Sequence, residues 1–173
     1  CSKELNIKYV RYERLGALEQ ISCDNIIRVK DYDEAIEYIK TLNGNVLNTT
    51  GGNNVTKFIN IDFNYRVIHR ILPSPSVLSK IVDAGIKIID IIAIQGPITY
   101  DLEKAFIKQF DVKAILTKDS GVQGGVLDKF KAAKDSNIKI IVIEKTKFDY
   151  ELEFNDEESL VDFLVVHENF TQR

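Results

Sequence analysis

The chain has 173 residues, of which 45% are hydrophobic, and 23 Lys+Arg against 26 Asp+Glu give a net charge of −3. This is ordinary globular composition, and the length predicts one main domain, since domains have about 100–200 residues. The weak acidity and the lack of Lys/Arg blocks argue against nucleic acid or an anionic membrane as partner. Apolar runs such as residues 86–94 are too short for the roughly 20 residues that a bilayer requires.

The two cysteines, Cys1 and Cys23, have no CxxC or Cys/His spacing, so neither a disulfide framework nor a metal site is predicted. We therefore expect a reducing, cytoplasmic environment. The sequence contains no Met and shows no signal-peptide pattern at its start. We expect a fragment or a processed piece, with residues missing upstream, and the oligomeric state stays open.

The first part of the chain predicts two strands followed by a helix. Apolar and polar residues alternate over residues 6–12 and, more briefly, over 26–30. Asp31 is a good N-cap for a helix over 32–42, whose apolar residues recur at spacings of three and four, and Gly44 ends it.

From residue 46 onwards, strands alternate with helices. The predicted strands cover residues 46–50, 65–72, 88–94, 113–117 and 138–144, with an edge strand in 148–154. The predicted helices cover residues 55–59, 76–84, 100–110 and 126–136, and a last one, capped by Asn155 or Asp156, runs to about residue 168. This order is typical of a parallel sheet covered by helices.

Three of these strands, at 88–94, 112–117 and 138–144, are near-continuous Ile and Val runs, as in strands buried on both faces. The predicted fold class is therefore α/β, a Rossmann-like three-layer α/β/α domain with a mostly parallel sheet. We expect residues 46–173 to form this domain. Residues 1–45 would be a segment that follows a missing amino-terminal half-domain and could pack with the main domain.

Glycine is concentrated where a ligand would bind in such a sheet, beyond the carboxyl ends of the strands. Loops at 49–52, 95–97 and 117–125 follow predicted strands, and the first and third contain five of the nine glycines. Glycine permits close approach of the backbone, and a helix N-terminus attracts phosphate. Neither loop is a strict GxGxxG or GxxxxGK[ST] motif, so an ordinary tight turn stays open as the alternative.

Charged residues near these loops suggest the type of dinucleotide. Arg70 lies about twenty residues beyond Gly51, where dinucleotide folds carry an acid for the ribose or a cation for a 2′-phosphate. Arg66 and Arg70 supply cations and no acid, which favours NADP over NAD; solvated strand-face charges are the alternative. Lys118 and Asp119 could orient a substrate or donate a proton, or could form only a loop-stabilising ion pair or turn.

Other catalytic chemistries have little support. The two histidines, His69 and His167, are far apart and lack metal-ligand spacing, so we expect structural or exposed roles. No Ser-His-Asp order, GxSxG elbow or HExxH motif occurs, which argues against hydrolases.

An ordered set of motifs resembles one family. The segments are RYER at 11–14, TTG at 49–51, RVxxxILPSP at 66–75, IAIQGP at 92–97, TKDSGVQGG at 117–125, Ala132-Ala133 and IIVIEK at 140–145. Together they resemble precorrin-6A reductase, and more closely its cobalt-precorrin-6A form. The resemblance covers nearly all of residues 9–145. Each motif is weak alone, but the ordered set is specific.

The resemblance implies a reductase that passes hydride from NADPH or NADH to a tetrapyrrole, precorrin-6A or cobalt-precorrin-6A, in cobalamin biosynthesis. It also implies two Rossmann-like halves with the active site in the cleft between them, of which this chain represents the second. A proton would come from solvent or from Asp119. The residues expected to hold the cofactor or the edge of the substrate are Thr49, Thr50, Gly51, Arg66, Arg70, Gln95, Gly96, Lys118, Ser120, Gly121, Gly124 and Gly125, with Pro97 beside them.

Two readings of other classes compete with this one. A non-catalytic nucleotide-binding or regulatory module would explain the glycine loops but not the RYER and IAIQGP segments. A structural or partner-binding piece would instead predict an exposed apolar helix face.

Overall fold

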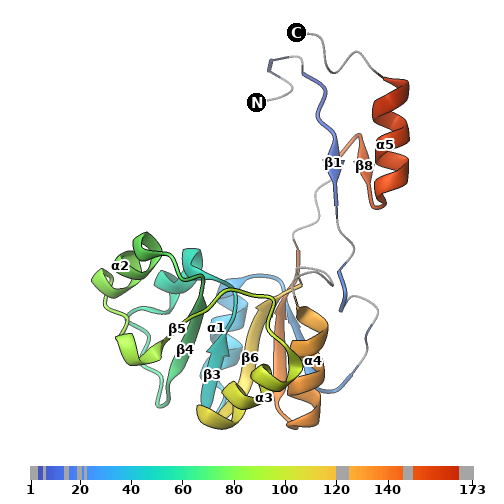
Figure 1. Cartoon of the computed structure of the whole chain (residues 1–173). Coiled ribbons are helices and arrows are strands. Elements are labelled where there is room, and N and C mark those ends of the chain that lie inside the picture. Colours follow the sequence, from blue (N-terminus) through green and yellow to red (C-terminus); the bar gives the residue numbers. More distant parts are fainter. Residues whose placement is uncertain are drawn as a thin grey trace. The chain divides into compact units, whose positions relative to one another are not determined.

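The computed structural model describes residues 4–5, 7–13, 16–18, 21, 23–119, 125–145 and 150–167 (Figure 1). The chain divides into two compact units: residues Cys1–Gly16 with Lys147–Arg173, and residues Ala17–Thr146. Among the helices within these described ranges, none has the length and apolar character needed to cross a membrane.

The larger unit is built on a six-stranded sheet with the order β2-β7-β6-β3-β4-β5, in which every pair is parallel. The strands are β2 (Ile26–Val29), β3 (Asn45–Asn48), β4 (Val67–Ile71), β5 (Ile91–Ala93), β6 (Val112–Lys118) and β7 (Lys139–Ile143). The α/β fold class with a mostly parallel sheet is confirmed.

The connections between these strands are helical. They are α1 (Tyr32–Lys40), the 3-10 helix η1 (Gly52–Phe58), α2 (Pro75–Asp83), the short 3-10 helix η2 (Ile88–Asp90), α3 (Tyr100–Gln109) and α4 (Val126–Asp135). Asp31 caps α1 as predicted, its carboxylate accepting a hydrogen bond from the Glu34 amide at 2.9 Å. The predicted turns after β3 are a 3-10 helix rather than an α-helix.

Two apolar layers sandwich the sheet, because successive side chains of a strand point to opposite faces. On β6, Ile115 packs with α3 and α4, whereas Leu116 packs with α1 and η1. Figure 1 shows α3 and α4 on the viewer's side of the sheet. Both side chains are fully buried, so β6 has the two-sided burial that its Ile-rich sequence predicts.

The same prediction was wrong for residues 88–94. Ile88 and Ile89 form η2 and are 72% and 71% exposed, and the strand covers only Ile91–Ala93. β5 is at the edge of the sheet and pairs only with β4. A run of isoleucines does not distinguish an edge strand from a central one, because the pairing partners are remote in the sequence.

Residues 26–45, part of the segment that we expected could pack with the main domain, lie in the larger unit. β2 pairs with β7 along its whole length, and Ala35 and Ile39 of α1 are fully buried against the sheet. Residues 26–45 therefore belong with the sheet. This grouping depends on a strand pairing across more than a hundred residues, which local patterns do not reveal.

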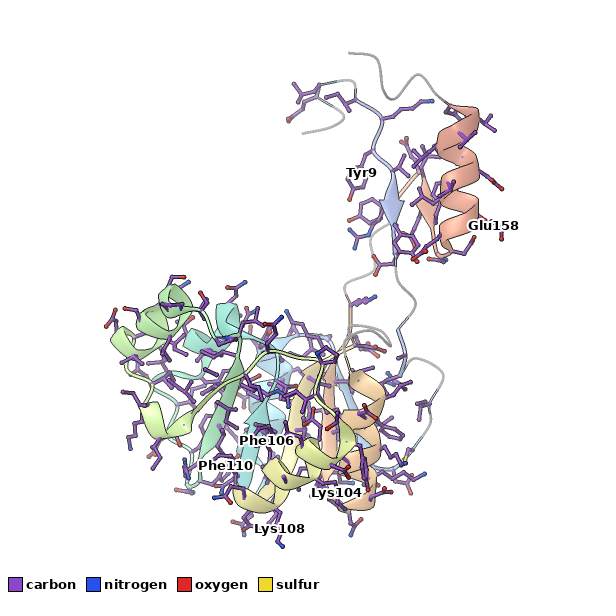
Figure 2. All side chains as sticks on the ribbon, in the orientation of Figure 1. Tyr9, Lys104, Phe106, Lys108, Phe110 and Glu158 are labelled. Carbon is purple, nitrogen blue, oxygen red and sulfur yellow. The ribbon has the colours of Figure 1, made fainter. Side chains whose placement is uncertain are left out.

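The smaller unit contains β1 (Arg11–Tyr12), β8 (Glu153–Phe154) and α5 (Glu157–Val166). The two strands pair in parallel, and Tyr9, labelled in Figure 2, packs against Tyr150 with ring centroids 5.5 Å apart. Asp156 caps α5 by accepting from the Ser159 amide at 2.7 Å. The strand predicted over residues 6–12 is shorter than expected.

Leu47 offers a test of the core. It is fully buried in β3 among residues of α3, α4 and β6, so Leu47→Ala should lower the free energy of unfolding by about 2–5 kcal/mol. Urea unfolding measures this loss. Ile89→Ala, at a position 71% exposed, is the control and should change it by less than about 0.5 kcal/mol. Similar losses in both variants would contradict this assignment of the core.

Candidate functional site

The path of the chain reverses between β3 and β6, which are neighbours in the sheet. From β3 the chain proceeds to β4 and β5, and it then returns to β6 on the other side of β3 before reaching β7. The connections that follow β3 and β6 therefore leave this point in opposite directions. In open parallel sheets, ligands bind beyond the carboxyl ends of the strands at such a switch point.

The loops that leave β3 and β6 begin side by side. Asn48 and Leu116 are register partners, and Thr49 bonds to the Leu116 carbonyl twice, through its amide at 2.8 Å and its hydroxyl at 2.9 Å. The first and third predicted glycine loops thus start at one place. We call this carboxyl edge, with residues 49–52, 95–97, 118–119 and 125, the switch edge.

A buried polar network supports the loop after β3. Asn48 accepts hydrogen bonds from the Thr50 amide at 3.0 Å and the Thr50 hydroxyl at 2.8 Å. Its amide nitrogen donates to Nδ1 of His69 at 3.1 Å. Both Thr49 and Thr50 therefore have hydroxyl groups engaged within the protein, and their contribution to a ligand would come from the backbone.

His69 has the structural role that we predicted. It is 2% exposed, and its ring makes an edge contact with the Phe58 ring, with the two centroids 5.5 Å apart. Burial lowers the pKa of His69 from 6.5 to about 4, since a charged ring would lose its hydration. The neutral ring can accept the Asn48 hydrogen bond at physiological pH.

Gly51 leaves the most open backbone at the switch edge. Its φ is +86°, a conformation that side-chain-bearing residues rarely adopt, and a Cβ placed on it would meet no atom of the described residues within 4 Å. Gly52 differs, because a Cβ there would lie 2.4 Å from Cγ1 of Val77. Gly52 is thus needed for packing against α2, whereas none of the described side chains occupies the space beside Gly51.

Asp119 anchors a second segment to the end of β6. Its two carboxylate oxygens accept hydrogen bonds from the amides of Ala17 at 2.9 Å and Leu18 at 2.8 Å, and the residue is 5% exposed. Arg28 holds the same segment by donating to the Leu18 carbonyl. This geometry assigns Asp119 to positioning the backbone, and it leaves the carboxylate poorly placed to reach a substrate.

Gly125 brings the loop after β6 against the loop after β5. It has φ +67° and is the N-cap of α4; a Cβ there would lie 3.3 Å from Cβ of Pro97 and 3.6 Å from the Ile98 nitrogen. The Gly96–Pro97 peptide bond is cis. Because Gly125 has no side chain, the first N–H groups of α4 receive no cap from that residue. The predicted residues Ser120, Gly121 and Gly124 lie outside the described ranges.

The structure places the two predicted arginines away from the switch edge. Arg66 precedes β4 at the opposite edge, where Nε donates to Asp90 at 2.6 Å. Arg70 lies on the face covered by α3, and it forms an ion pair with Glu103 at 2.8 Å, with side-chain exposures of 11% and 1%. Arg70 is therefore too buried to recognise a 2′-phosphate, and Arg66, whose side chain is 40% exposed, lies at the edge opposite the switch edge.

A third buried charge accompanies Arg70 and Glu103. Lys129 of α4 is 4% exposed and donates to the hydroxyl of Thr117 at 3.0 Å. Burial, followed by the nearby Arg70 charge, lowers the pKa of Lys129 from 10.5 to about 8, although Glu103 opposes the shift. The sequence does carry a signal, because Lys129 stands three residues from both Val126 and Ala132 on the apolar stripe of α4.

Lys118 has a different environment from its neighbour Asp119. Its ammonium nitrogen lies 5.3 Å from the centroid of the Tyr32 ring, and that of Lys57 lies 5.5 Å from the same centroid. Tyr32 begins α1 and Lys57 belongs to η1. Our predictions included Lys118 but missed Lys57 and Tyr32, since nothing in their local sequence brings them together.

A surface hollow at the opposite edge is less suited to a ligand. It has a volume of about 520 Å³ and is lined at the carboxyl end of α3 by residues that include Lys104 and Lys108. Figure 2 shows both lysines at this end of the sheet. Cations near a helix C-terminus satisfy its dipole, and Asp101 and Asp111 line the same hollow.

The described residues contain no cluster of three His, Cys, Asp or Glu that could hold a metal ion.

Comparison with known proteins identifies the family. The family model described as precorrin-6x reductase CbiJ/CobK matches residues 1–165. The chain belongs to the precorrin-6x reductase family. Cobalt-precorrin-6A reductase of Methanocaldococcus jannaschii is 38% identical over 163 residues, which are 94% of this chain and 63% of that protein. The Priestia megaterium protein of the same name is 34% identical over 168 residues, 95% of this chain and 65% of its own.

The chain therefore spans somewhat less than two thirds of the length of these curated reductases. Among solved structures, a CobK precorrin-6A reductase superposes with a TM-score of 0.74 at 14% identity, covering 96% of this chain and 65% of that one. This likeness supports the fold. The resemblance stated from the motifs is confirmed by the family match.

Asp119→Asn tests whether the carboxylate of Asp119 anchors the backbone of residues 17 and 18. Removal of the charge weakens the two amide hydrogen bonds, so we expect a loss of about 2 kcal/mol in the free energy of unfolding. Asp111→Asn, at a side chain 78% exposed, is the control and should change it by less than about 0.5 kcal/mol. Urea unfolding measures both. Unchanged stability of Asp119→Asn would contradict the anchoring role.

The lowered pKa of Lys129 predicts that the free energy of unfolding rises with pH in a defined range. Between pH 8 and 10.5 the unfolded chain keeps the Lys129 proton and the folded protein releases it, so stability rises with pH in that window. Relative to Lys129→Met, wild-type protein should gain on the order of 1–2 kcal/mol between pH 7 and about 9.5. Urea unfolding at several pH values measures the difference, with Lys104→Met as the control. A difference that is flat with pH would refute the shift.

Proposed function

We propose that this chain contributes to an NAD(P)H-dependent reductase that acts on a precorrin-6A-type tetrapyrrole in cobalamin biosynthesis. The observation that carries the proposal is the switch edge, where two glycine loops and the loop at 95–97 meet on the carboxyl side of a parallel sheet. Membership in the precorrin-6x reductase family and the names of the relatives support the reaction. The cobalt-containing substrate is favoured because those relatives are cobalt-precorrin-6A reductases.

The switch edge fits a dinucleotide. The free space beside Gly51 permits close approach of the backbone, and the N-terminus of α4 begins at Gly125 with its dipole directed at this edge. Lys118 adds a cation that has no ion-pair partner among the described residues. Phosphate groups match these features, and the hydroxyls of Thr49 and Thr50, already bonded to Leu116 and Asn48, keep the loop rigid.

When bound, the cofactor supplies a hydride. The chain's own contribution is to hold two large rings in a reactive geometry, since orientation alone lowers the barrier of such a transfer substantially. The residues described at the carboxyl ends of β3, β5 and β6 would supply the surface against which the rings are oriented. The accompanying proton comes from solvent in this proposal, because the carboxylate of Asp119 is held by two amides.

The geometry of the two arginines gives no preference between NADPH and NADH. Arg70 is paired with Glu103 and Arg66 with Asp90, so neither arginine supports the predicted preference for NADPH. Calorimetric titration of the 173-residue chain with each cofactor gives the ratio of affinities directly.

Gly51→Val tests the proposed cofactor contact. Its side chain would occupy the free space that a phosphate would use, so we expect the affinity for NADPH, measured by calorimetry, to fall at least tenfold. Gly85→Val is a closely matched control: Gly85 has φ +104° and also has nothing within 4 Å of a Cβ, but it lies after α2. Both variants carry a similar backbone strain.

The comparison of these two variants isolates the ligand contact from the strain. Loss of affinity in Gly51→Val but not in Gly85→Val would support the cofactor site. Equal affinities in two folded variants, or no binding by folded wild-type protein, would contradict it.

A further inference from the structure

Two lysines from separate connections converge on one aromatic ring at the switch edge. Lys57 lies in η1, the connection that follows β3, and Lys118 is the last residue of β6, so the pair comes from the two sides of the switch point. Both ammonium nitrogens lie within 5.5 Å of the Tyr32 centroid. The negative face of a tyrosine ring attracts ammonium groups, which favours holding two like charges near each other here.

The acidic side chains at the start of α1 do not neutralise this pair. Asp31 accepts from the Glu34 amide at 2.9 Å, and Glu34 accepts from the Lys30 amide at 2.8 Å, so both carboxylates serve backbone N–H groups. Asp33 is 3.8 Å from Lys57 and is 86% exposed, which makes it a weak partner. In the described ranges, Lys118 has no carboxylate within ion-pair distance.

Tyr32 itself has an unmet hydrogen-bonding group. Its hydroxyl is buried and has no partner among the described residues, while the residue as a whole is 9% exposed. A buried donor without an acceptor costs about 1–3 kcal/mol. An oxygen-rich anion would bring acceptor atoms to the two ammonium groups that meet over the Tyr32 ring.

We propose that Lys57 and Lys118, supported by Tyr32, form a binding site for an oxyanion group of the ligand. This inference rests on the proposed function, and it adds Lys57 and Tyr32 to the site. Carboxylates and phosphates share the required chemistry, a compact group of negatively charged oxygens that accepts from ammonium donors. The carboxylate side chains of a tetrapyrrole and the phosphates of a dinucleotide are the two sources that the test separates.

The test is calorimetric titration of the 173-residue chain with three probes: NADPH, inorganic pyrophosphate, and uroporphyrin as an octacarboxylate tetrapyrrole. Lys57→Gln and Lys118→Gln keep most of the side-chain volume and remove the charge. Each substitution should lower the affinity for the anion about tenfold, the effect expected from loss of a hydrogen bond to a charged group. Binding of wild-type protein should also weaken as ionic strength rises.

Lys113→Gln is the matched control. Lys113 is 50% exposed, close to the 45% of Lys57, and it also pairs with an aspartate, Asp111. It lies near the start of β6, at the other end of the strand from Lys118. Its replacement should change the affinity for each probe by less than twofold.

The pattern of losses identifies the source of the anion. Weaker binding of uroporphyrin alone would assign the site to macrocycle carboxylates, and weaker binding of NADPH and pyrophosphate would assign it to phosphate; both support the site. Unchanged affinities in the two variants, equal losses in Lys113→Gln, or no binding of any probe by folded wild-type protein would overturn it.

Failure of the inference is distinguishable from failure of the proposed function. If NADPH or uroporphyrin binds without dependence on Lys57 and Lys118, the function stands and the oxyanion site does not. If only pyrophosphate binds, with loss in both variants, the oxyanion site stands and the proposed cofactor and substrate do not.

Discussion

The pairing of β3 with β6 is the constraint on which the rest of the structure depends. It joins strands that are distant in the sequence, with Thr49 bonding twice to the carbonyl of Leu116, and it makes this boundary the point where the connections diverge. Without this pairing, the glycine loops after β3 and β6 would end at unrelated places, and Lys57 and Lys118 would not meet over Tyr32.

Local patterns predicted the elements well where a cap or a buried apolar run defined them. Asp31 and Asp156 cap helices as expected, and β6 and β7 are buried on both faces. The Ile-rich run at 88–94 failed because edge and central strands differ in their partners rather than in their composition. The same reason explains residues 26–45, whose place in the sheet depends on the pairing of β2 with β7.

For the candidate site, the sequence located loops better than side chains. The glycine loops are together at the switch edge, because the carboxyl ends of parallel strands share one edge whatever their order. The two arginines are not there: Arg66 stands before β4 rather than after it, and the side chain of Arg70 faces α3. The spacing along a strand gives the distance of a residue from a loop. Successive residues point to opposite faces of the sheet, so a shift of one position changes the face on which a charged side chain lies.

Several acidic side chains near this edge accept hydrogen bonds from backbone amides. This shared role limits the chemistry that the edge can perform. Asp119 holds the amides of Ala17 and Leu18, and Asp31 and Glu34 hold amides at the start of α1. These carboxylates are therefore occupied by backbone N–H groups. The cations, by contrast, are left available: Lys57 and Lys118 contact a ring rather than a strong anionic partner. An edge with engaged acids and available cations is suited to binding and orienting anionic molecules, and a hydride transfer needs that more than acid–base catalysis.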